Sequence, residues 1–130
     1  MMELTIENQV YQFHFGMGFL RDINKTVAMP VDGMPNVKKN VGLRYTIMKL
    51  YDGDVEGLEE VLNTANAGQS PRVTKMLLDS YIDDEDTDID ALFEEVMGFL
   101  KTANATKKET LSVLETIEKE KAKMAAKEVS

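Results

Sequence analysis

The densest group of chemically capable side chains is the acidic run DSYIDDEDTDIDALFEE, residues 79–95. It holds nine carboxylates and no Lys or Arg. Calcium loops place oxygen ligands at positions 1, 3, 5 and 12 of a twelve-residue stretch. With Asp84 at position 1, Asp86 and Asp88 fall at positions 3 and 5. Glu95 falls at position 12, so calcium binding is the first hypothesis to test.

Two residues argue against a calcium loop. Position 6 needs a glycine for the sharp turn, and here it is the β-branched Ile89, for which a positive φ is costly. Position 9 is Leu92, which offers no oxygen and holds no water. The pattern therefore predicts no metal site and no cofactor.

The same residues fit the start of a helix. Thr87 or Asp88 can cap its first turn, and Asp90 in that turn suits the helix dipole. Apolar residues then recur at helical spacing through Leu100. The remaining acids form a surface of one sign that a basic partner could contact, for which the candidates are Asp83, Asp84 and Asp86.

Composition places the chain among single compact domains. Its 130 residues are 43% hydrophobic, contain no cysteine and carry a net charge of −8. The chain offers neither a basic surface for nucleic acid nor an apolar stretch for a membrane, and the N-terminus lacks the blocks of a signal peptide. We expect a cytosolic protein that binds neither nucleic acid nor membrane.

No catalytic constellation is present in the sequence. It contains one histidine, His14, and no phosphate-binding loop or nucleophile elbow, so we expect no enzyme activity. The alternative is a small acidic ligand-binding or carrier protein, with calcium or a prosthetic group in the acidic region. The segment Asp79-Ser80-Tyr81 is similar to the attachment site of a carrier protein. In carrier proteins the attachment serine begins a helix, whereas Ser80 is predicted to lie late in a helix.

The predicted fold is mainly α (α+β), with an N-terminal β-hairpin, five to six helices and an exposed C-terminal helical arm. Residues alternate in polarity on both sides of a turn at 7–9, which predicts the hairpin. Its apolar face contains Leu4, Ile6, Tyr11, Phe13 and Phe15. The proline-rich segment 28–40 reads as an exposed loop.

Helical patterns occupy most of the remaining chain. Asp54 and Thr74 are predicted caps, Gly68 a predicted stop, and the helix at 41–50 is expected to be central and largely buried. The stretches are Phe19 to Val27, Val41 to Leu50, Asp54 to Gly68, Thr74 to Ile82, 89–103, and a last helix from Thr106.

We divide the chain into a body, 1–105, and a C-terminal helix with a charged arm, 106–130. Thr106 and Glu109 match a capping box. Apolar residues form only a narrow stripe on this helix, so the arm should be exposed and open to a partner. The candidate binding residues are Leu111, Leu114 and Ile117.

Three long segments together resemble the tail assembly chaperones of siphophages of Gram-positive bacteria. The resemblance covers about residues 2 to 110, interrupted at 28–40, and has no catalytic signature. It is carried by MELTIENQVYQFHFGMGFLRDIN, YDGDVEGLEEVLNTANAGQSPRVTKMLLDSYIDD and DEDTDIDALFEEVMGFLKTANATKK.

The resemblance implies a role in virion morphogenesis. Such a protein binds the tape-measure protein, keeps it soluble and helps to recruit tail-tube subunits. The resemblance implies that the tail-tube protein is contacted through a longer form made by a ribosomal frameshift, and that this chain is the short form. It acts in the host bacterial cytoplasm and is absent from the mature virion. Self-association is a further expectation.

Overall fold

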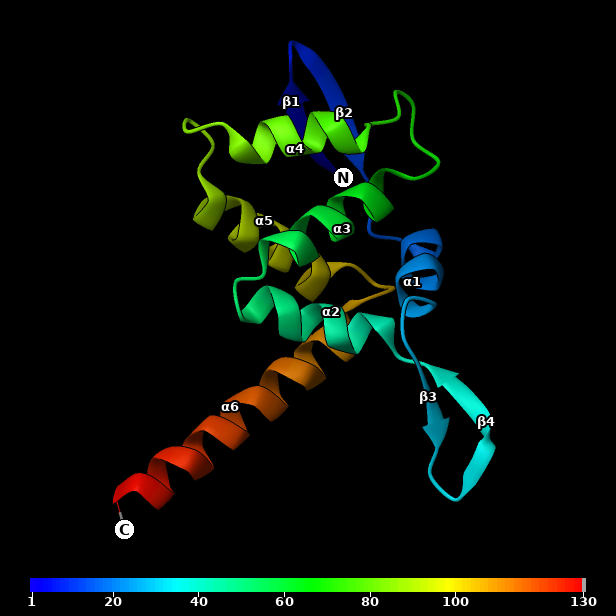
Figure 1. Ribbon diagram of the computed structural model, residues 1–130, viewed down its shortest axis with the longest axis vertical. Helices are drawn as coiled ribbons and strands as arrows, with labels where there is room; N and C mark the ends of the chain where they lie inside the picture. Colours follow the sequence, from blue (N-terminus) through cyan, green and yellow to red (C-terminus); the bar gives the residue numbers. More distant parts are fainter. Residues whose placement is uncertain (130) are drawn as a thin grey trace.

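The structure is a computed structural model that describes residues 1–129, with only the backbone at position 129. Over these residues it confirms a mainly α fold with an N-terminal hairpin and six helices (Figure 1). The strands are β1 (Met2–Ile6), β2 (Gln9–Phe13), β3 (Ala28–Val31) and β4 (Met34–Asn40). The helices are α1 (Met17–Asn24), α2 (Gly42–Tyr51), α3 (Val55–Asn66), α4 (Lys75–Asp83), α5 (Ile89–Thr102) and α6 (Lys107–Val129).

The β1–β2 hairpin forms as the alternation predicts. The strands are antiparallel, with Ile6 opposite Gln9. The turn residues Glu7 and Asn8 both have positive φ, 51° and 66°, as a tight type I′ turn requires. All five residues of the predicted apolar face are buried, and Phe13 is 0% exposed. The hairpin therefore closes one side of the core.

The core lies between this hairpin and the helices. Phe15 makes an edge contact with Phe19, at 5.1 Å between ring centres, and stacks on Phe99 at 5.7 Å. This cluster joins the chain after β2 to α1 and α5. The helices contribute fully buried aliphatic side chains, among them Ile23, Ile47, Leu58, Leu62, Leu78, Val96 and Leu100.

Asn66, buried at the end of α3, connects three segments by hydrogen bonds. Its amide nitrogen donates to the Gln12 carbonyl oxygen over 2.8 Å. Its amide oxygen accepts from the Val73 backbone N–H at 2.6 Å and from the Arg72 guanidinium at 2.9 Å. Because buried polar groups are costly without partners, this asparagine fixes the β1–β2 hairpin against α3.

The segment 28–40 is a second hairpin, so the prediction of a loop was wrong. β3 and β4 pair antiparallel, with an irregularity between Pro30 and Val31 and a turn at Gly33, where φ is 78°. All of β4 is exposed. Strands that face water on both sides have no alternating burial, so period-two patterning does not reveal them.

All four predicted capped helix starts are confirmed in position, since α3, α4, α5 and α6 begin directly after Asp54, Thr74, Asp88 and Thr106. Asp54, Thr74 and Asp88 each accept a hydrogen bond from a backbone N–H in the first turn. The capping box at Thr106 was wrong. Its hydroxyl donates to the Leu100 carbonyl oxygen over 2.8 Å, and its N–H donates to the Ala103 carbonyl oxygen. The buried Thr106 therefore donates to two carbonyl oxygens at the end of α5, and its hydrogen bonds do not involve a side chain of α6.

Candidate partner-binding surfaces

Helix α6 begins against α2. The Arg44 Nε lies 3.1 Å from the Glu109 Oε1, which ties the first turn of α6 to the outer side of α2. Thr110, the next residue, and Val113, about one turn on, are buried. The start of α6 is therefore part of the folded body.

A second attachment lies near the C-terminal end of α2. The Tyr51 hydroxyl donates to the Glu118 Oε1 over 3.1 Å, and the Lys121 Nζ lies 4.6 Å from the centre of the Tyr51 ring. A hydrogen bond with Tyr51 also raises the pKa of Lys121. From position 118 to 128 every side chain is exposed, so α6 leaves the body here and extends as an arm (Figure 1).

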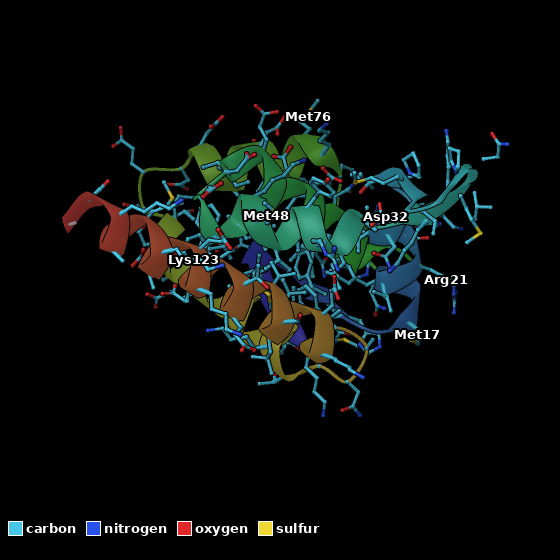
Figure 2. All side chains as sticks on the ribbon, turned by 90° about the horizontal axis from the view of Figure 1, so that it is seen from below. Met17, Arg21, Asp32, Met48, Met76 and Lys123 are labelled. Carbon is cyan, nitrogen blue, oxygen red and sulfur yellow. The ribbon has the colours of Figure 1, made fainter. Side chains whose placement is uncertain are left out.

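An apolar groove runs between these two attachments. Its volume is about 440 Å³, and its apolar lining comes from Met48 on α2 and from Val113, Ile117 and Met124 on α6. Met48 is 43% exposed and Met124 is 64% exposed. Figure 2 looks onto this side, with Met48 on α2 and Lys123 on α6 facing the viewer. Helix α2 is central as predicted, but the face that contains Met48 is exposed to solvent in the groove.

The predicted stripe on α6 does not form one surface. Ile117 lines the groove, and Leu114 is half-buried against the core. Leu111 is 51% exposed and lies outside the groove. Successive steps of three residues drift around a helix of 3.6 residues per turn, so the ends of such a stripe diverge. Val113, Ile117 and Met124 are separated by four and seven residues, so they lie on one face of α6. This spacing indicates the groove-lining residues better than the three-residue spacing of the predicted stripe.

The acidic loop between α4 and α5 has its own hydrogen bonds. The Asp84 carboxylate accepts from the Asp86 backbone N–H at 2.9 Å, and the Thr87 hydroxyl donates to the Tyr81 carbonyl oxygen at 2.6 Å. Asp83, Asp84 and Asp86 are exposed. No grouping of three metal-ligating side chains occurs within residues 1–129. These hydrogen bonds hold the conformation of the loop.

The two sets of predicted partner residues are far apart. The acidic loop lies near the β1–β2 hairpin, at the end of the molecule opposite the α6 arm (Figure 1). A hollow of about 390 Å³ separates the loop from the β1–β2 turn. One small partner segment could not contact both sets, so they belong to different surfaces.

A pair of carboxylates joins α3 to α4. Burial, a hydrogen bond with Asp79 and the negative charge of Asp79 together raise the pKa of Glu59 to about 7. Neighbouring Lys75 acts in the opposite direction. Protonation of Glu59 therefore relieves repulsion between carboxylates on α3 and α4.

Comparison with known proteins identifies the family. A sequence model described as phage tail assembly chaperone protein, TAC, matches residues 3–115. The chain therefore belongs to the phage tail assembly chaperone family. No curated protein and no solved structure matches it. Within the described part of the chain, none of the helices has the length and apolarity to cross a membrane.

Proposed function

We propose that this chaperone binds the tape-measure protein and keeps it soluble during tail assembly, without enzymatic activity. The open apolar groove between α2 and α6 carries the proposal. In this proposal the body of residues 1–105, with the buried start of α6 packed on it, carries the exposed remainder of 106–130 as a binding arm. The protein acts in the host cytoplasm of a siphophage and leaves before the virion is complete.

The groove suits an amphipathic helix. Such helices bind by laying an apolar face into a hydrophobic groove. The flexible side chains of Met48 and Met124 adapt to differently shaped apolar residues, which suits a long partner with many non-identical segments. Arg44, Glu120 and Lys121 also line the groove and would contact the polar flanks of a bound helix.

The remaining surface supports solubility. A net charge of −8 keeps copies dispersed while they cover apolar segments of a partner. We propose that recruitment of tail-tube subunits uses a surface outside the groove, which leaves the groove free for the tape measure. Leu111 and the acids Asp83, Asp84 and Asp86 are exposed and available for such contacts.

Co-expression with the tape-measure protein, followed by affinity capture, tests this function. Met48→Glu combined with Met124→Glu places two charges in the groove at exposed positions, so the fold should survive. Met76→Glu is the matched control, because Met76 is 78% exposed on α4, away from the groove (Figure 2). We expect the groove variant to lose at least about tenfold in captured tape measure, or about 1.4 kcal/mol. Equal capture by both variants would exclude the groove.

A further inference from the structure

The apolar groove between α2 and α6 continues into a second hollow at the base of the β3–β4 hairpin. This hollow has a volume of about 380 Å³, and its lining includes Leu43 and Lys108 from the first turns of α2 and α6. Arg44 and Ser112 line both the groove and the hollow. The groove and the hollow therefore form one continuous surface.

The charge of this surface differs between its two ends. Three basic side chains line the second hollow: Lys39, Arg44 and Lys108. Glu109 is the one carboxylate among its described lining residues, and it is paired with Arg44 over 3.1 Å. We therefore call this the basic hollow. Towards the arm, the groove is lined by Glu120 and Lys121, one charge of each sign. Positive charge is thus in excess at the hairpin end.

The β3–β4 hairpin positions one of the three basic side chains. In the register of this hairpin, Lys39 on β4 lies opposite Met29 on β3. The Tyr45 hydroxyl on α2 donates to the Met29 Sδ over 2.8 Å, which holds this part of the hairpin against α2. Lys39 consequently lines the same hollow as Lys108, although the two residues are far apart in the sequence. The hairpin supplies charge to the binding surface.

Helices α2 and α6 run in the same direction and set the axis of the groove. Arg44 contacts Glu109 near the start of both helices. Tyr51 contacts Glu118 further along both. Glu109 and Met124 are fifteen residues apart on α6, or about 22 Å along its axis. A bound helix of about four turns therefore spans the surface from the basic hollow to the arm.

We propose that the segment of the tape-measure protein that binds here is an amphipathic helix with acidic residues in its last turn, antiparallel to α2 and α6. This orientation, which rests on the proposed function of the groove, places the C-terminal end of the partner helix at the basic hollow. That end of a helix carries about half a negative charge, and acidic side chains there add to it. The apolar face of the same helix lies on Met48 and Met124.

Two synthetic peptides of about eighteen residues test the direction and the chemistry of the partner. Both carry leucines at helical spacing on one face. One peptide has a pair of glutamates in its last turn, and the other has the pair in its first turn. Fluorescence anisotropy at low salt measures the Kd of each peptide for the full chain. The ratio of the two Kd values reports the preferred direction.

Charge reversal in the basic hollow should change this ratio. Lys39→Glu with Lys108→Glu alters two exposed side chains, so the fold should survive, which circular dichroism checks. We expect the preference for the last-turn peptide to fall by about tenfold relative to wild type. The helicity of each free peptide is the same in both measurements and cancels from the comparison. An unchanged ratio overturns the proposal.

The control is Lys75→Glu with Lys101→Glu, which makes the same change in net charge on α4 and α5. Neither residue lines the groove or the basic hollow, so the wild-type ratio should persist. An equal shift in this control would trace the effect to net charge and overturn the specific contact. A last-turn peptide with alanines in place of the leucines should bind weakly. Binding as tight as that of the leucine peptide would mean that the hollow acts without the groove, against the proposal.

Capture of the co-expressed tape-measure protein separates this inference from the proposed function. We expect Lys39→Glu with Lys108→Glu to lower capture about fivefold. If this variant captures like the wild type while Met48→Glu with Met124→Glu loses capture, the function stands and the acidic end of the partner is wrong. If Met48→Glu with Met124→Glu captures like its control, the proposed function fails, and this inference fails with it.

Discussion

The hydroxyl of Tyr51 donates a hydrogen bond to the Glu118 carboxylate over 3.1 Å, beyond the last half-buried residue of α6. The same ring lies beneath Lys121. In the sequence, the apolar stripe of the last helix ends at Ile117, which predicts that the residues after it are dispensable for folding. Because of these contacts, we expect the dispensable part of α6 to begin about one turn later than the sequence indicates.

Two truncations locate that boundary. Deleting 123–130 removes side chains that are exposed at every described position, 123 to 128, and should leave the free energy of unfolding within about 0.5 kcal/mol of wild type. Deleting 118–130 also removes both contacts of Tyr51 and should cost about 1 kcal/mol. Urea denaturation measures both. Tyr51→Phe, which keeps the ring but not the hydroxyl, should fall between them, and a cost of several kcal/mol for the shorter deletion would place the arm in the core.

Asn66→Ala should destabilise the protein by about 3 kcal/mol, because it leaves the buried carbonyl of Gln12 and the N–H of Val73 without their partner. Asn63→Ala is the control, since it removes one exposed hydrogen bond to Arg72 and should cost under about 0.5 kcal/mol. Chemical denaturation compares the two. Similar costs would mean that Asn66 does not connect β2 to α3 as described.

Thr110→Val should be neutral or should stabilise by up to about 1 kcal/mol. Within the described residues the buried Thr110 hydroxyl has no hydrogen-bond partner, and valine has nearly the same shape. Thr106→Val should instead destabilise, because that hydroxyl donates to Leu100. Thermal unfolding of both variants gives the comparison. A clear loss of stability in the Thr110 variant would show that its hydroxyl is bonded.

Glu59 should make stability depend on pH. Its pKa is about 7 in the folded protein, against an ordinary value of 4.5, so the folded state binds the extra proton. The resulting stabilisation is full below about pH 4.5 and is lost as the pH rises through 7. Glu59→Gln mimics the protonated form and should gain melting temperature relative to wild type between pH 5 and pH 8.

Asp79→Asn provides the matched test of that coupling. It removes the negative charge that raises the Glu59 pKa, so the pH dependence between 5 and 8 should weaken. If the wild type and Glu59→Gln show parallel melting curves across this range, the carboxylate pair does not share a proton.

Millimolar calcium should leave the melting temperature unchanged. Asp84 and Asp88 already accept backbone hydrogen bonds, and Ile89 opens α5 where a calcium loop would turn. Magnesium at the same concentration controls for screening of the acidic surface. A calcium-specific rise of more than a few degrees would imply a site in the native state and favour the ligand-binding alternative.

The sequence predicted those elements whose residues alternate between core and water. β1, β2 and the capped helices have this signature, because one side of each is buried and the other is not. The β3–β4 hairpin lacks it, since its exposure is uniform. Thr106 and Glu109 match the capping-box motif, which depends on local sequence alone. The Thr106 hydroxyl is buried by tertiary packing, however, and it bonds to the Leu100 carbonyl oxygen that lies next to it.

The sequence did not predict the groove, although Ile117, one of its lining residues, was a candidate. Ile117 was found from the helix pattern of α6 alone. Met48 belongs to it as well, but a groove is made by two helices, and a single sequence does not show that α2 and α6 lie side by side. The spacing of Val113, Ile117 and Met124 identifies the side of the groove that α6 forms. The side that α2 forms can be recognised only from the fold.

The β3–β4 hairpin joins the body through two chain ends that are hydrogen-bonded to each other. The Val41 N–H donates to the Val27 carbonyl oxygen over 2.8 Å, and the Leu43 N–H donates to the Asn24 side chain over 2.9 Å, so the two ends of the insertion are held together from below. Gly42 sits so close to the Ile23 carbonyl that any side chain there would collide. A short link between these two chain ends could therefore replace residues 28–40 while the body folds as before. The hairpin is therefore structurally separable from the body.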